Sequence, residues 1–351
     1  MDFGRPDNAR TINRLKVLSA LRNNSDMSCA GLSRLLNINK VSIGEIVKKL
    51  IAEGLVRETG KIPMPSGRPA VRIDLDWDKG SVLALIDQGK GVTAAQCNLK
   101  GKIIRMERFP KGDTKEDILM HLNALLKRLA RNSQIKIHGA VIASDSDWSW
   151  LSEEAPFPVM TENRMKCIAS AETARSGNAL SNALFIDLDE HVSAAYSDGE
   201  IRVLPGFAHL KVSNAGKCSC GRTGCLDALS SISALEDAYG GIDRKDPFSD
   251  PVIKARMKQN LDALAFAAAE TMKITGAEFA MLTGPLSALP DEYYPLLTEK
   301  TNSLLPEGKG CMIYKSLAGG SAALEGAAIL ALDEWFFRTP LIRKLYELEK
   351  F

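Results

Sequence analysis

The chain has 351 residues, a length that suits two or three domains better than one. Hydrophobic residues make up 45% of it and charged residues 25%, which is the composition of a globular protein with a packed core. No stretch approaches the roughly 20 apolar residues of a membrane span. The first six residues also lack the apolar core of a secretory signal, so we expect a cytoplasmic protein with no membrane partner.

The net charge of +2 conceals an uneven distribution. Residues 1–72 contain 13 Lys and Arg against 6 Asp and Glu, a net charge of +7, which leaves −5 for the remainder. A small basic segment on a mildly acidic body is typical of a nucleic-acid-binding head. Charged runs are usually only solvated surfaces, so this observation supports other signals rather than standing alone.

The first 75 residues predict three helices followed by a hairpin. We expect a first helix at 9–21, a second capped by Ser28, and a third that Gly54 ends. Two short strands, 55–57 and 70–75, flank a proline-rich loop. This order is that of a winged helix-turn-helix domain. Three helices alone occur in many unrelated folds, so the hairpin that follows them makes the pattern specific.

The third helix is the candidate DNA reader, since the second helix of such a motif enters the major groove with its N-terminal residues on base edges. The residues so placed are Asn39, Lys40, Ser42 and Glu45; Asn39 and Ser42 can hydrogen-bond bases, and Lys40 can meet a phosphate or a guanine. Lys48 and Lys49, further along, are placed for the phosphate backbone. The missing side chain at Gly44 would let the helix approach DNA closely.

The hairpin tip, Ser66-Gly67-Arg68-Pro69, carries an arginine on a loop stiffened by proline. An arginine so placed can enter a minor groove, where A·T-rich DNA concentrates negative potential. We therefore include Arg68 in the DNA-binding set. The alternative is a helical bundle with an ordinary solvated loop.

From residue 81 the pattern changes to alternating strands and helices, which predicts a duplicated α/β core. We expect residues 1–76 to form the winged helix-turn-helix domain and residues 77–351 to form two lobes. The first lobe would comprise about 77–180 plus the C-terminal helix, and the second about 181–320. We expect strands of this core at 82–86, 92–97, 103–109, 138–143, 183–188 and 279–283. We expect helices at 115–131, 230–240, 251–275 and 321–332.

Three of the seven cysteines crowd into one short segment, which favours a metal site over disulfides. Cys218, Cys220 and Cys225 are accompanied by two glycines that allow a tight fold, and His209 completes a Cys3His set. Zinc takes such tetrahedral sites, and four protein ligands leave no open position for catalysis. We predict structural Zn²⁺ here; buried thiols without metal are the alternative.

The same segment, from His209 to Asp227, resembles the ROK family (repressors, uncharacterised frames and sugar kinases), with its pattern of GH, a spacer, CxCGxxGC and an acidic residue. The wing sequence resembles that of the family's regulators, and the helix containing Glu325-Gly326-Ala327-Ala328 is similar to the family's closing helix. The resemblance implies an actin/hexokinase-like fold with two lobes around a cleft, and dimers or tetramers. Regulators of the family repress sugar-use operons and respond to a sugar or sugar phosphate, or to a partner protein.

Three departures from the family pattern argue against kinase activity. Family kinases have the motif DxGGT at the turn after their first strand, where its glycines let backbone amides approach the phosphates of ATP. Here Asp87 lacks the adjacent glycine pair. The second phosphate loop is replaced by residues 188–192, which contain no glycine and two carboxylates. The family's catalytic base follows an Asn, whereas Asn163 is followed by Arg164, which cannot accept a proton.

Effector binding is predicted from the same resemblance. Asn163, His209 and Asp227 occupy positions that contact sugar in relatives, while Gly206 replaces a family Glu. Arg164 could instead clamp a phosphate or carboxylate, so we expect an anionic effector or none. The tryptophans of the short loop at 144–162 could stack on a sugar, although packing beneath the loop is the commoner use.

The sequence thus predicts a DNA-binding regulator, a repressor of carbohydrate-related genes, whose inactive kinase-like body oligomerises and senses an effector. The main alternative is an active ROK sugar kinase that transfers phosphate from ATP to a hexose. A third is a zinc-dependent scaffold acting through the apolar C-terminal segment 335–351, for which packing on its own domain or dimer mate is the plainer explanation.

Overall fold

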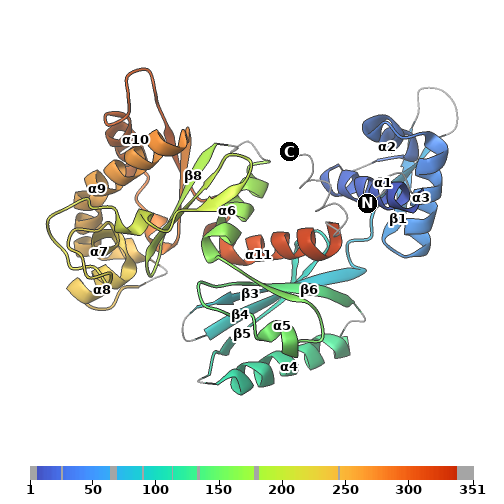
Figure 1. Ribbon diagram of the computed structural model, residues 1–351, viewed down its shortest axis with the longest axis horizontal. Coiled ribbons are helices and arrows are strands. Elements are labelled where there is room, and N and C mark those ends of the chain that lie inside the picture. Colours follow the sequence, from blue (N-terminus) through green and yellow to red (C-terminus); the bar gives the residue numbers. More distant parts are fainter. Residues whose placement is uncertain are drawn as a thin grey trace. The chain divides into compact units, whose positions relative to one another are not determined.

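The computed structural model describes residues 6–24, 27–63, 69–88, 91–112, 114–132, 135–177, 182–243 and 246–337. The basic head contains three helices and a two-stranded antiparallel hairpin (Figure 1). They are α1 (Pro6–Asn23), α2 (Cys29–Leu36), α3 (Lys40–Ala52), β1 (Val56–Ile62) and β2 (Ala70–Leu75). This order confirms the predicted winged helix-turn-helix; the tip that carries Arg68 lies outside the described residues.

Short capping contacts define the turn between α2 and α3. Ser28 accepts a hydrogen bond from the amide of Gly31 at 3.2 Å and begins α2. Asn37 ends that helix in the left-handed conformation, with φ of 53°. Two residues later the side-chain oxygen of Asn39 accepts from the amide of Ser42 at 2.8 Å and begins α3. The chain therefore reverses within three residues, which fixes how the two helices meet.

The first sheet has the strand order β5-β4-β3-β6-β7, and β3, β4 and β5 form an antiparallel meander. Helices α4 and α5 lie against one face of it (Figure 1), with Leu83, Leu122 and Trp148 in the shared core. The elements are β3 (Gly80–Asp87), β4 (Gly91–Asn98), β5 (Ile103–Pro110), α4 (Lys115–Asn132), β6 (Lys136–Ala143), α5 (Leu151–Glu154) and β7 (Val159–Glu162).

The second sheet has the order β10-β9-β8-β11-β12, with an antiparallel meander followed by parallel strands on the other side of β8. Its helices α8, α9 and α10 contribute to one large apolar core with the sheet. The elements are α6 (Arg164–Arg175), β8 (Ala183–Leu188), β9 (Val192–Ser197), β10 (Ile201–Val203), α7 (Asp227–Ser230), α8 (Ile232–Tyr239), α9 (Pro251–Thr275), β11 (Phe279–Thr283), α10 (Tyr293–Asn302) and β12 (Met312–Lys315). The repeated meander confirms the predicted duplicated α/β core.

Contacts divide the chain into two compact units. One consists of Met1–Ile142, Ser146–Thr161 and Ala328–Phe351, and the other of Ala143–Asp145 and Glu162–Ala327. Within the described part of the chain, no helix has the length and apolar character that a bilayer span demands.

Helix α11 (Ala322–Leu332) and the π-helical turn Asp333–Phe337 close the described chain. A Cβ at Gly326 would lie 1.7 Å from the carbonyl oxygen of Cys167, so only glycine lets α11 pack directly on α6. A Cβ at Gly139 would lie 1.9 Å from the indole of Trp335. This tryptophan therefore packs on its own domain, while residues 338–351 lie outside the described residues.

Candidate functional site

The exposed side of α3 is the candidate DNA-reading surface. Ile43, Val47 and Leu50 are buried on one side of the helix, which leaves the opposite side to solvent. Lys40, Lys48 and Lys49 are exposed, and none of them forms an ion pair with another described residue. Of the other two predicted base contacts, Ser42 is half-buried and Asn39 has its oxygen committed to the helix cap, which leaves only the amide nitrogen to donate.

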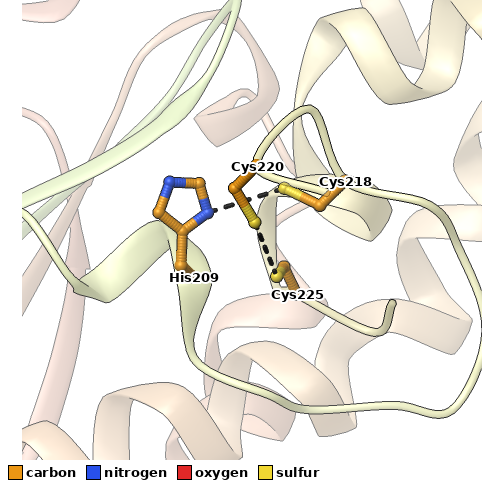
Figure 2. A group of neighbouring side chains, drawn as sticks. All are labelled: His209, Cys218, Cys220 and Cys225. Atoms are coloured by element: carbon orange, nitrogen blue, oxygen red, sulfur yellow. Dashed lines mark hydrogen bonds between the residues drawn. The ribbon is translucent and has the colours of Figure 1, made fainter. Parts of the chain in front are cut away.

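The four predicted metal ligands converge on one point (Figure 2). Their ligand atoms all lie within 4.8 Å of one another. The Sγ atoms of Cys220 and Cys225 are 3.7 Å apart, and Cys218 Sγ lies 3.5 Å from His209 Nδ1. A tetrahedral zinc with bonds of about 2.3 Å to sulfur and about 2.0 Å to nitrogen would separate its ligands by roughly 3.8 and 3.5 Å. The residues present therefore fit zinc.

Glycine is required to close the loop around these ligands. Gly221 and Gly224 have φ of 85° and 83°, in the left-handed region that side chains disfavour. A Cβ at Gly224 would lie 1.8 Å from the carbonyl oxygen of Ser213, so no other residue fits there.

The ligand thiols differ in their surroundings. Burial raises the pKa of Cys225 to about 11, whereas a hydrogen bond from the backbone of Arg222 lowers the pKa of exposed Cys220.

A pocket of about 400 Å³ adjoins the predicted metal ligands. It brings together Asn163, His209 and Asp227, the three residues that the resemblance assigned to sugar contact. Its other lining residues are Asp145, His191, Val192, Ser193, Ala194, Val203, Leu204, Pro205, Ala208 and Ser219. No lysine or arginine occurs among these described lining residues.

Hydrogen bonds hold the polar side chains of the pocket in place. Asn163 caps α6 by accepting from the amide of Met165 at 2.9 Å, and its Nδ2 donates to Asp145 at 2.7 Å. Asp227 accepts from the amide of Val192 at 2.7 Å and lies 3.1 Å from His191 Nδ1. The polar side chains of the pocket are thus two carboxylates, an amide, two imidazoles and two serine hydroxyls. The sequence did not indicate Asp145 or His191 as pocket residues, because each lies far along the chain from its partner. Asp145 is 18 residues from Asn163, and His191 is 36 residues from Asp227.

Arg164 does not line the pocket. Its guanidinium forms ion pairs of 2.6 Å with Asp187 and 2.5 Å with Asp189. The side chain of Asp187 is 1% exposed, and its other oxygen accepts from Thr283 at 2.8 Å. Burial raises the pKa of Asp187, and the charge of Arg164 opposes that rise. Because two carboxylates neutralise the guanidinium, the expectation that Arg164 clamps an anionic effector is corrected.

Asp87, the remnant of the family's phosphate turn, is also engaged. Its Oδ2 accepts from Lys111 at 2.7 Å and from the indole of Trp148 at 3.2 Å. Trp148 is 2% exposed and stacks against Trp150, so this tryptophan packs beneath the loop rather than facing a ligand.

Comparison with known proteins agrees with these features. The chain matches the ROK family profile over residues 85–334. It belongs to the ROK family. Residues 10–57 also match a winged helix-turn-helix DNA-binding profile.

Among curated relatives, this ROK protein is 25% identical over 261 residues to a xylose repressor of Caldicellulosiruptor bescii. That match covers 64% of the chain and 65% of the relative, so it spans slightly less than two thirds of the relative's length.

Solved structures show the fold. A ROK family transcriptional regulator, a homologue of the Escherichia coli Mlc protein, matches with a TM-score of 0.75 at 19% identity, covering 97% of this chain and 99% of the other. A ROK hexokinase from Thermus thermophilus matches with a TM-score of 0.59 at 21% identity, over 71% of this chain and 97% of the other.

Proposed function

We propose that this ROK protein is a transcriptional repressor of carbohydrate-related genes. Residues 1–76 would read operator DNA, and residues 77–351 would form the two lobes that associate and bind effector. The observation that carries the proposal is α3, a recognition helix whose exposed side bears three lysines that form no ion pair with another described residue. Phosphate neutralisation by such lysines favours duplex DNA. The similarity to the xylose repressor of Caldicellulosiruptor bescii supports the same function.

Phosphoryl transfer is not part of the proposal. A kinase needs a carboxylate to accept the sugar's proton, and the residue after Asn163 is a permanent cation. That cation is held by Asp187 and Asp189, which would repel the phosphates of ATP. The active sugar kinase therefore has no observation in its favour beyond the fold.

The effector that suits the pocket is a neutral polyhydroxylated molecule, such as a sugar. Carboxylates accept hydrogen bonds from sugar hydroxyls, and both Asp145 and Asp227 line the pocket. The same carboxylates would repel a sugar phosphate. Calorimetry should therefore detect a free sugar and give weaker binding for its phosphate ester; the reverse order would refute this assignment.

Zinc is the proposed ion of the Cys3His cluster, where it would tie the loop before Asp227 to the helices that follow. Bound there, the ion supplies a structural cross-link with no open coordination position. If Nδ1 of His209, which faces Cys218, were the ligand atom, the ring proton would be on Nε2 and the histidine would offer the pocket a donor. Metal analysis should find one zinc per chain in wild-type protein and little in Cys220→Ser, which should also be less stable. Zinc-free wild-type protein, purified without chelators, would refute the site.

DNA binding is tested with Lys40→Ala and Arg68→Ala. A homodimer or tetramer would present two heads to a pseudo-palindrome with half-sites one or two helical turns apart. Each variant should weaken binding to that operator without unfolding the protein. Lys300→Ala, which removes a body lysine paired with Asp262, is the control and should bind normally. Wild-type affinity in both head variants, or ATP consumption with a hexose, would contradict the proposal.

A further inference from the structure

The side chain of Val41 has the largest exposed fraction, 78%, among the large hydrophobic residues in the described part of the head. It is the second residue of α3. Neither core packing nor helix propensity accounts for valine at this position, since a β-branched side chain is a poorer helix former than alanine, lysine or glutamate.

Val41 belongs to a stripe on the solvent side of the recognition helix. Gly44, Glu45 and Lys48 follow it at i+3, i+4 and i+7, so all four share one face, opposite the buried Ile43. A Cβ at Gly44 would meet nothing within 4 Å, so the surface is low at the centre of this stripe.

The charges along α3 indicate which part of DNA this stripe faces. Val41, Gly44 and Glu45 carry no positive charge, and a carboxylate is repelled by phosphate. Lysines come before and after them along the helix, at Lys40 and Lys48. An uncharged and acidic centre between cations suits base edges in the groove, with the lysines directed to the flanking phosphates.

We propose that Val41 is a specificity-determining residue that reads the 5-methyl group of a thymine in the major groove; the inference rests on the proposed DNA-binding function. Each base pair displays a distinct pattern in that groove, and the thymine methyl is its apolar feature. A valine side chain at the N-terminal end of the recognition helix matches that methyl by size and polarity.

The test uses full-length protein and operator duplexes selected from a randomised library by the wild type. Each thymine is replaced in turn by deoxyuridine, which lacks only the 5-methyl group. At one thymine of each half-site, the replacement should weaken wild-type binding about fourfold, the effect of losing one buried methyl contact. Val41→Ala should bind the thymine operator about fourfold more weakly and should not distinguish thymine from deoxyuridine at that position.

Ile51→Ala, which shortens an exposed apolar residue at the far end of the same helix, is the matched control and should discriminate as the wild type does. Alanine suits a helix, so both variants should fold, as thermal unfolding will verify. The inference is overturned if Val41→Ala keeps the wild-type discrimination or if the wild type ignores every replacement. A wild type that enriches no sequence at all would overturn the proposed function as well, before any variant is made.

Discussion

The lysines of α3 and two cations of the body, Arg164 and Lys111, have opposite environments. Lys40, Lys48 and Lys49 are exposed and form no ion pair with other described residues. In the body, Arg164 is held by Asp187 and Asp189, and Lys111 is held by Asp87. The head can therefore attract an external phosphate, whereas these body cations are already neutralised.

This contrast explains how a kinase-like fold can serve a regulator. Both ATP and duplex DNA are phosphate ligands, and both require cations that are not satisfied internally. In this chain only the head offers such cations among the residues compared, while the body keeps the pocket around Asp227 and the cysteine loop. Under the proposed function, the fold would bind an effector at this pocket without phosphorylating it.

The largest effect should come from breaking the internal neutralisation in the body. Arg164→Ala leaves the buried Asp187 without its cation. Loss of one partner of a buried pair lowers the free energy of unfolding by about 3–5 kcal/mol. Urea unfolding should show that loss. Arg175→Ala, which breaks the more exposed pair with Glu325, is the control and should cost less than about 1 kcal/mol.

The pH dependence of Arg164→Ala sharpens this test. Burial already raises the pKa of Asp187, and removing the opposing charge of Arg164 should raise it further. When the pKa of a carboxyl is higher in the folded than in the unfolded protein, the free energy of unfolding falls as the pH rises through the folded-state pKa. The defect of Arg164→Ala should therefore be larger at pH 8 than at pH 5. An equal defect at both values would show that the ion pair is not its cause.

The helices of the head could be predicted because their apolar residues follow a helical period, and the buried strands β3 and β8 because they are short apolar runs. Helix α6 was not predicted, and the reason is its burial: every residue from Cys167 to Glu172 is buried, so the helix has no polar face to reveal its period. The short strands β7 and β10 give too few residues to establish an alternation.

The candidate sites divide in a similar way. The clustering of His209 with the three cysteines could be predicted because these residues lie within 17 residues, from His209 to Cys225, and have a distinctive spacing. The role of Arg164 could not, since its partners lie 23 and 25 residues away and approach it only when β8 pairs within its sheet. Spacing along the chain reveals local metal loops, but not ion pairs assembled by tertiary structure.

A smaller effect should follow from removing one exposed lysine of α3. Lys48→Ala should weaken operator binding by a similar factor for all sequences, because a phosphate contact carries no base information. The slope of log affinity against log salt should fall by about 0.9, the value for one neutralised phosphate. Titrations between low and moderate salt measure that slope. An unchanged slope would mean that Lys48, although exposed, does not face the backbone.

The smallest expected effect comes from adding a side chain at Gly44, where the surface of α3 is low. This change should raise the stability of the protein and lower its affinity for DNA. Gly44→Ala should raise the free energy of unfolding by up to about 1 kcal/mol, because alanine is the better helix former and its Cβ meets nothing within 4 Å in the free protein. If the helix backbone lies close to base edges, the same methyl group should weaken operator binding. Gly31→Ala in α2 is the matched control, since its Cβ would make only ordinary contacts of 3.5 Å or more. It should stabilise the head without changing DNA affinity. Unaltered operator binding by Gly44→Ala would mean that α3 stands further from the groove than its exposed face implies.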